Sequence, residues 1–107
     1  MVAPRRFDVF LVPLDPARGA EMQKTRPCVI VSPDESNRLL RTVVIAPLTS
    51  KPQRFPGRVQ MMFRGKQGEM ATDQLRAVDK TRLVKKVGAV DPADRARITA
   101  ALVEFFA

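Results

Sequence analysis

Three apolar runs in the first half of the chain have the length and composition of β-strands. They cover residues 7–14, 27–33 and 42–50, and the second and third are rich in Val and Ile. Because their apolar residues are continuous rather than alternating, we expect both of these strands to be central and buried on two faces. Pro13 indicates that the first strand either lies at a sheet edge or ends there.

The second half of the chain predicts shorter elements. Residues 58–63 lead through a glycine-containing turn into residues 69–75, which is typical of a β-hairpin. Residues 82–90 indicate a further short strand with an exposed basic face. Between the second and third apolar runs, residues 34–40 have the composition of one or two helical turns.

A longer helix is predicted at the C-terminus. Asp91 is a good N-cap and Pro92 fits the first helical position. Five or six short strands closed by one helix indicate a mainly β (α+β) fold, a small bent sheet or barrel, in a single domain over residues 1–107. Apolar residues recur along the helix at spacings of three and four, so they form one stripe that packs either on the core or at an interface. These residues are Ile98, Ala101, Leu102, Phe105 and Phe106.

Positive charge is concentrated in the middle of the chain. The whole chain has a formal net charge of +8. Residues 38–86 hold twelve basic and three acidic side chains, a net of +9, and the rest holds seven basic and eight acidic ones, a net of −1. A field of this sign attracts polyanions, so we expect a nucleic acid or an acidic protein as partner rather than a merely basic surface.

The absence of some residue types excludes several kinds of chemistry. The chain has no His, Trp or Tyr, and Cys28 is its one cysteine. Ser-His-Asp and Cys-His catalysis are therefore excluded, as are a His-based ribonuclease mechanism and a His- or Cys-rich metal site. Catalysis would depend on Arg, Lys, Asp, Glu, Ser or Thr. No run has the character of a signal peptide or membrane span, so the expected location is the cytoplasm.

Arg26 is the first candidate for binding an anion. It precedes Pro27, which favours extended geometry for it at the entrance of the second apolar run. A guanidinium fixed there can hold a phosphate through two hydrogen bonds, and it stays charged at any working pH. From the residues alone, a surface arginine that caps a strand is an equally good interpretation.

Other polar candidates adjoin the predicted strands. Thr49 falls where a buried strand gives way to a polar loop, so its hydroxyl can emerge at the rim. Asp73 lies in a segment that otherwise resembles a strand, where aspartate is disfavoured. Such a violation indicates either a functional site or an ion pair, with Arg76 or another cation. Glu21 either orients Arg26, accepts a proton, or is simply solvated.

Short motifs follow one another along nearly the whole chain: Asp15-Pro16, Gly19 with Glu21, Arg26-Pro27, Asn37, Pro47 with Thr49, and Asp73-Gln74. In this order they resemble the MazF/PemK/Kid family of toxin endoribonucleases from toxin–antitoxin systems. The resemblance implies an SH3-like barrel that forms a homodimer and cuts single-stranded RNA at a short motif, without a metal or other cofactor. It also implies attack by the ribose 2′-OH, which leaves a 2′,3′-cyclic phosphate and a 5′-OH, and inhibition by an antitoxin with an acidic C-terminal tail.

The resemblance also assigns roles to residues. It makes Arg26 and Thr49 catalytic, with Arg26 stabilising the phosphate and Thr49 hydrogen-bonded to it, and it makes Asp73 a further catalytic candidate as general base. In the Kid-like branch this base works with a histidine and an arginine, whose positions here are Ala20 and Ala71. The residues expected to bind RNA or shape the site are Glu21, Gln23, Lys24, Thr25, Ser50, Gln74 and Arg76.

Two other classes of function are compatible with a small basic barrel. One is a gyrase-poisoning toxin of the related barrel, which would need a C-terminal helix whose end grips gyrase. The other is a non-catalytic RNA-binding module. The combination of Arg26-Pro27 with Thr49 favours the endoribonuclease over the gyrase poison. RNA binding with a steep salt dependence but without cleavage would instead favour the binding module.

Overall fold

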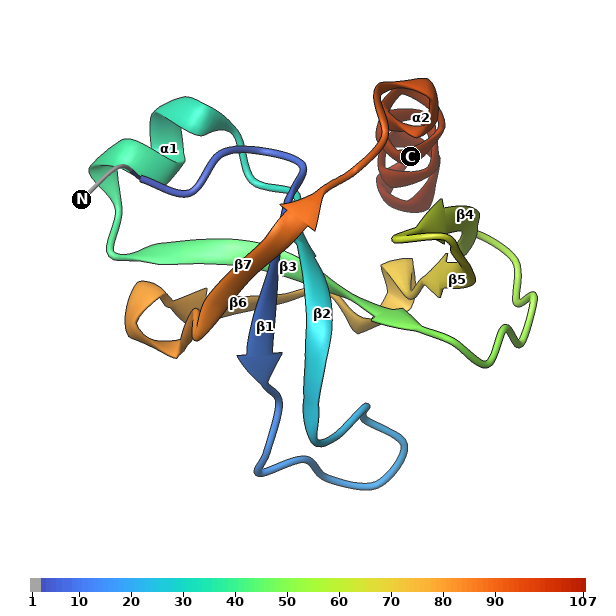
Figure 1. The fold of residues 1–107 in the computed structure, drawn as a ribbon, viewed down its shortest axis with the longest axis horizontal. Helices are drawn as coiled ribbons and strands as arrows, with labels where there is room; N and C mark the ends of the chain where they lie inside the picture. Colours follow the sequence, from blue (N-terminus) through green and yellow to red (C-terminus); the bar gives the residue numbers. More distant parts are fainter. Residues whose placement is uncertain (1–2) are drawn as a thin grey trace.

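Short antiparallel strands and two α-helices make up the part of the chain that the computed structural model describes, residues 3–107 (Figure 1). Two single turns of 3-10 helix lie between the later strands. In chain order the elements are β1 (Asp8–Pro13), β2 (Thr25–Ile30), α1 (Asp34–Leu39), β3 (Thr42–Thr49), β4 (Val59–Phe63), β5 (Lys66–Met70), η1 (Thr72–Gln74), β6 (Arg76–Asp79), η2 (Lys80–Arg82), β7 (Lys85–Ala89) and α2 (Pro92–Phe106).

The long strand β3 is the centre of the sheet. The strand order is β4-β5-β3-β2-β1-β7, and β6 pairs with β3 off this path. Along its length β3 pairs with β6 in its first half, with β2 in its middle and with β5 at its end. Because one strand has three partners, the sheet curls into an open half-barrel, and α2 lies beside β4 (Figure 1). The prediction of a small bent β fold with a C-terminal helix is confirmed.

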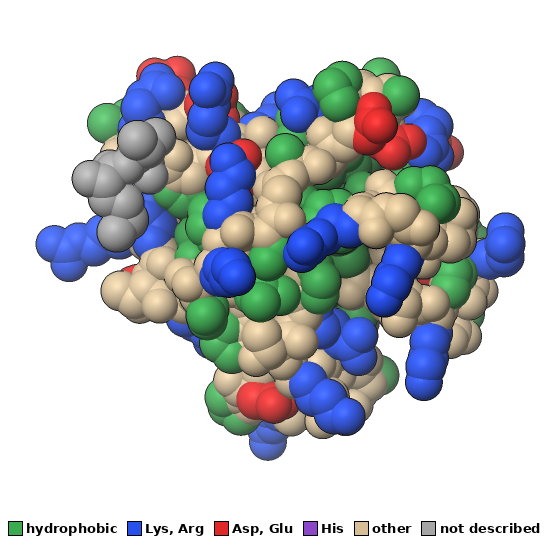
Figure 2. Space-filling view, viewed as in Figure 1, with side chains coloured by type: hydrophobic (Ala, Val, Ile, Leu, Met, Phe, Trp, Pro, Cys, Tyr) green, Lys and Arg blue, Asp and Glu red, His purple; other side chains and the backbone are tan. Residues whose placement is uncertain are grey.

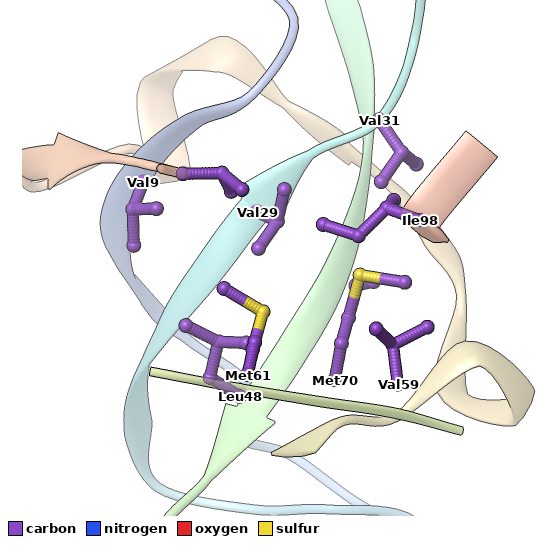
Figure 3. Close-up of a cluster of buried hydrophobic side chains, with 10 residues drawn as sticks. Val9, Val29, Val31, Leu48, Val59, Met61, Met70 and Ile98 are labelled. Carbon is purple, nitrogen blue, oxygen red and sulfur yellow. The ribbon is translucent and has the colours of Figure 1, made fainter. Parts of the chain in front are cut away.

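Apolar side chains fill both faces of the central strands. Val29 of β2 belongs to a cluster with Ile98 of α2 (Figure 3), whereas its neighbours Cys28 and Ile30 belong to a second cluster on the other face. This two-sided burial explains why the second and third apolar runs do not alternate with polar residues. The prediction of two central strands is confirmed.

The helix α2 begins as predicted, but its apolar stripe is only partly buried. The Asp91 side chain accepts a hydrogen bond from the backbone N–H of Ala93, which caps the first turn. Ile98 is fully buried, whereas Phe106 is 72% exposed. The stripe therefore packs on the core at its start and leaves an apolar end at the C-terminus. No helix within residues 3–107 combines the length and apolar character needed to cross a membrane.

The structure decides between the two interpretations of Pro13 and corrects the placement of Arg26. The strand β1 lies between β2 and β7 and ends at Pro13, so of the two predicted possibilities the strand end is confirmed and the sheet edge is not. The second strand begins at Thr25, so Arg26 lies inside the strand instead of at its entrance. Proline is accommodated at position 27 because the ladder to β3 begins only at Cys28, which leaves the start of β2 with one neighbouring strand.

Two further corrections concern the segment after β5. Asp73, expected in a strand, lies in the 3-10 turn η1, which suits aspartate better than a strand does. The strand β6 is not among the predicted strands, because only Val78 of its four residues is buried and no apolar run marks it. Its identity as a strand comes from pairing with β3, which is a tertiary effect.

Candidate active site

Arg26 and Thr49 lie near the ends of two adjacent strands and line one hollow. The register of β2 and β3 pairs Cys28 with Pro47 at the end of their ladder. Arg26 and Thr49 each lie two residues beyond this last pair. Both residues are partly exposed, and both line a hollow of about 240 Å³ together with residues of the β4–β5 hairpin. The fold therefore brings the two expected catalytic residues together where two central strands end.

The side chain of Arg26 is held at one end only. Its Nε donates a hydrogen bond of 3.0 Å to the carbonyl oxygen of Gln23, and its backbone pairs with Val12 of β1. Within residues 3–107, no protein group makes a hydrogen bond to the two terminal nitrogens of the guanidinium. A guanidinium anchored in this way presents two coplanar donors. It is arranged to bind two oxygens of one phosphate.

The hydroxyl of Thr49 binds the backbone of the loop that follows β3. Its Oγ1 accepts a hydrogen bond of 3.1 Å from the backbone N–H of Lys51. A hydroxyl that accepts one bond still has its proton to donate. Thr49 can therefore donate a hydrogen bond to an oxygen of a phosphate bound in the hollow that it shares with Arg26.

Several of the residues expected to bind RNA line a second, larger hollow of about 510 Å³. Its lining includes Pro47 of β3. Pro47 comes two residues before Thr49, so β3 contributes a residue to each of the two hollows. The expected residues that it brings together are Glu21, Asp73, Gln74 and Arg76.

One arginine from each hollow lies near the buried Cys28. Burial raises the pKa of the Cys28 thiol to about 12, although the charges of Arg26 and Arg76 both act to lower it. Both guanidinium groups are thus within electrostatic reach of one buried sulfur, and the thiol itself stays protonated and unreactive. Over the side of the molecule seen in Figure 2, Lys and Arg side chains are widely spread and acidic side chains lie mainly near the helices.

The loop between β1 and β2 carries three of the expected RNA-binding residues, Glu21, Gln23 and Lys24, and Thr25 follows as the first residue of β2. Gln23, Lys24 and Thr25 are exposed. The carboxylate of Glu21 accepts a hydrogen bond of 2.8 Å from the backbone N–H of Arg18, and so it braces its own loop. Ser50, which follows β3, is exposed as well.

Asp73 pairs with an arginine that the sequence interpretation does not name. Its two carboxylate oxygens accept hydrogen bonds from Nε and Nη2 of Arg58, at 2.7 and 3.0 Å. The hydrogen bonds from Arg58 hold the pKa of Asp73 below its usual value. Arg76, the partner considered from the sequence, instead donates to the carbonyl oxygen of Leu14. The ion-pair interpretation of Asp73 is confirmed with a different partner.

Arg58 and Glu69 form a buried ion pair at 2.9 Å, and their side chains are 7% and 0% exposed. The sequence interpretation counted both only as charges. The signal available in the sequence was a glutamate between Gly68 and Met70 in a predicted strand, since a buried glutamate needs hydrogen-bond donors. Within residues 3–107, no group of three His, Cys, Asp or Glu side chains is placed to hold a metal ion.

Comparison with known proteins decides the family. A model of the family described as PemK-like, MazF-like toxin of type II toxin-antitoxin system matches residues 5–106. The chain belongs to the PemK/MazF toxin family. One relative of this toxin is Endoribonuclease MazF9 of Mycobacterium tuberculosis (strain ATCC 25618 / H37Rv), which is 35% identical over 108 residues that cover 92% of each chain.

Solved structures of PemK/MazF toxins share the fold. One is an endoribonuclease in complex with its cognate antitoxin from a mycobacterial species, with a TM-score of 0.82 and 28% identity over 97% of this chain and 95% of that one. Another is MazF from Deinococcus radiodurans, with a TM-score of 0.83 over 97% of this chain and 96% of that one. The second is 21% identical, so it supports the fold alone.

Proposed function

We propose that this toxin, an endoribonuclease of the PemK/MazF family, cuts single-stranded RNA at a short sequence motif without a metal ion. The observation that carries the proposal is that Arg26 and Thr49 line one hollow near the ends of two central strands. The basic character of the chain supports an RNA substrate, because Lys and Arg supply the affinity of proteins for the phosphate backbone.

The proposed reaction is a transesterification. The ribose 2′-OH loses its proton and attacks the adjacent phosphorus, the bond from phosphorus to the 5′ oxygen breaks, and that oxygen takes up a proton. The products are a 2′,3′-cyclic phosphate and a 5′-OH. The free terminal nitrogens of Arg26 would neutralise the charge that develops on the phosphorus-bound oxygens, and Thr49 would donate to one of them.

Of the three catalytic candidates, Asp73 is the least suited to proton transfer. Its ion pair with Arg58 lowers its affinity for a proton, and neither Ala20 nor Ala71 offers a helping side chain. We propose that Asp73 contributes to the site by positioning Arg58, while Gln74 and Arg76 line the adjacent hollow for RNA.

The proposed protein partners are a second copy of the chain and an antitoxin with an acidic C-terminal tail. A relative solved in complex with its cognate antitoxin supports the second partner. The positive charge of residues 38–86 supports the acidic character of the tail, because like RNA it is a polyanion.

Cleavage of RNA in EDTA tests the proposal. We expect purified, antitoxin-free toxin to cut a pool of single-stranded RNAs in excess EDTA, at one motif that mapping of the 5′ ends identifies. Intact RNA with a correctly folded toxin would contradict the endoribonuclease proposal. Binding that weakens steeply with salt but never leads to cleavage would favour the non-catalytic RNA-binding module, and inhibition of DNA supercoiling would favour the gyrase poison.

A further inference from the structure

The buried carboxylate of Glu69 binds the loop that follows Thr49. Its oxygens accept hydrogen bonds from the backbone N–H groups of Gln53 and Arg54, at 3.2 and 2.7 Å. They also accept bonds from Arg58 at 2.9 Å and from the amide of Gln60 at 2.6 Å. Four donors thus converge on one side chain with no exposed surface. Glu69 therefore anchors loop 50–58.

This loop adopts a conformation that needs such support. Arg54 has a φ of 55°, in the left-handed region that non-glycine residues rarely occupy. The bond of 2.7 Å from its N–H to Glu69 holds that strained residue in place. Glu69 is also the cross-strand partner of Thr49 in the pairing of β3 with β5. The anchor of the loop is therefore next to a candidate catalytic residue.

Arg58 connects the same loop to the turn η1. It binds Glu69 with one nitrogen and Asp73 with two others, and the hydroxyl of Thr72 donates to the carbonyl oxygen of Gly57 at 2.7 Å. The turn η1 also binds the loop between β1 and β2, because the side chain of Gln74 accepts a hydrogen bond of 3.2 Å from the backbone N–H of Met22. One short turn thus holds both loops that border the Arg26–Thr49 pair.

The braced loop displays an aromatic ring. Phe55 is 53% exposed, and the guanidinium of Arg58 lies 4.8 Å from the centre of its ring. Proteins that bind single-stranded RNA commonly stack exposed aromatic rings on the bases. A ring supported by Arg58 at this distance offers such a surface on the loop that follows Thr49.

We propose that Arg58, held between Glu69 and Asp73, is a positioning residue that sets the shape of loop 50–58 and thereby the RNA sequence that the toxin selects. The loop contacts the bases next to the scissile phosphate, with Phe55 stacked on one of them. The inference rests on the proposed RNA cleavage at Arg26 and Thr49. It adds to that proposal a buried network that determines selectivity without touching the substrate.

The test compares three variants with a matched control on synthetic RNAs of randomised internal sequence. Arg58→Lys keeps the positive charge but loses the three hydrogen bonds that join Glu69 to Asp73. Asp73→Asn weakens the bond between Arg58 and η1 through a residue that is exposed. Phe55→Leu removes the aromatic ring. The control is Arg95→Lys, because Arg95 also lies over a phenylalanine ring and donates to a backbone carbonyl, yet belongs to α2. The readouts are the motif from mapped 5′ ends and hydrogen exchange of loop 50–58 in RNA-free protein.

In Arg58→Lys and Asp73→Asn we expect the backbone amide hydrogens of loop 50–58 to exchange faster than in wild type. Both variants should also discriminate roughly tenfold less against RNAs with a single-base change in the motif. Phe55→Leu should raise KM roughly tenfold with a smaller effect on kcat, and Arg95→Lys should keep the wild-type motif. A wild-type motif in both Arg58→Lys and Asp73→Asn would overturn the inference, and if Arg58→Lys does not fold, Asp73→Asn decides alone. Wild-type toxin that cuts none of the RNAs would instead overturn the cleavage proposal.

Discussion

Replacing Arg26 with alanine is expected to slow RNA cleavage by roughly 10²–10³-fold, the usual effect of removing one donor that stabilises developing negative charge. The loss should lie mainly in kcat, because the charge on the phosphate oxygens grows in the transition state. Stability should fall by only about 1 kcal/mol, since the side chain is partly exposed and makes one hydrogen bond, to Gln23. Single-turnover cleavage rates and thermal unfolding measure the two effects separately.

Two companion variants make this result specific. Arg26→Lys keeps the charge but loses the planar pair of donors, so it should recover only part of the rate. Arg41→Ala removes an equally charged, exposed side chain that lies in none of the hollows of the site, so its rate should stay within about twofold of wild type. If Arg26→Ala cleaves at the wild-type rate, Arg26 is not the phosphate-binding group.

Replacing Glu69 is expected to have the largest effect on stability. Glu69→Ala leaves Arg58 with Asp73 as its one carboxylate partner and removes the acceptor of two backbone N–H groups. Breaking a buried ion pair from one side typically costs about 3–5 kcal/mol. This is a large part of the stability of a small domain, so a substantial loss of folded protein is expected. Urea unfolding at neutral pH measures it, and a change below about 1 kcal/mol would contradict the structural role.

The same carboxylate predicts the sensitivity of the fold to acid. Burial alone would raise the pKa of Glu69, but hydrogen bonds from Gln60, Arg58 and two backbone N–H groups together lower it from 4.5 to about 2. The unfolded chain is therefore protonated first as the pH falls, and stability is lost progressively from pH 4.5 to about 2. A shift of this size corresponds to about 3 kcal/mol.

Glu69→Gln separates this titration from the packing of the side chain. The variant should be less stable than wild type at neutral pH, and its stability should change less between pH 4.5 and 2. A shallower dependence will persist, since the pKa of Asp73 is lowered too. Equal slopes for the two proteins over this range would show that Glu69 does not titrate as described.

The sequence alone predicts the parts of this fold that follow from local patterns. The runs around Val29 and Ile45 are apolar because both faces of the sheet are buried, and the cap at Asp91 is a local motif. The positions of Arg26 and Thr49 close to strand ends were also predictable, although Arg26 proved to lie just inside its strand. That both line one hollow depends on how the two strands pair, which no local pattern contains.

The network around Glu69 could not be predicted for a physical reason. It joins Arg58 of the loop before β4 to Glu69 of β5 and to Asp73 of η1, which are brought together only by tertiary folding. A charge in a strand pattern shows that a partner is needed but not which one. For Asp73 the sequence suggested a neighbour along the chain, Arg76, whereas the bidentate partner lies fifteen residues earlier.

One substitution in the substrate tests the central claim most directly. An RNA oligonucleotide that carries the mapped motif is compared, in EDTA, with the same oligonucleotide bearing a single 2′-deoxy nucleotide on the 5′ side of the cut. If Arg26 and Thr49 promote attack by the 2′-OH, the all-RNA strand is cut to a 2′,3′-cyclic phosphate and a 5′-OH, and the deoxy strand stays intact while binding with similar affinity. Cleavage of the deoxy strand at the same bond would contradict the account.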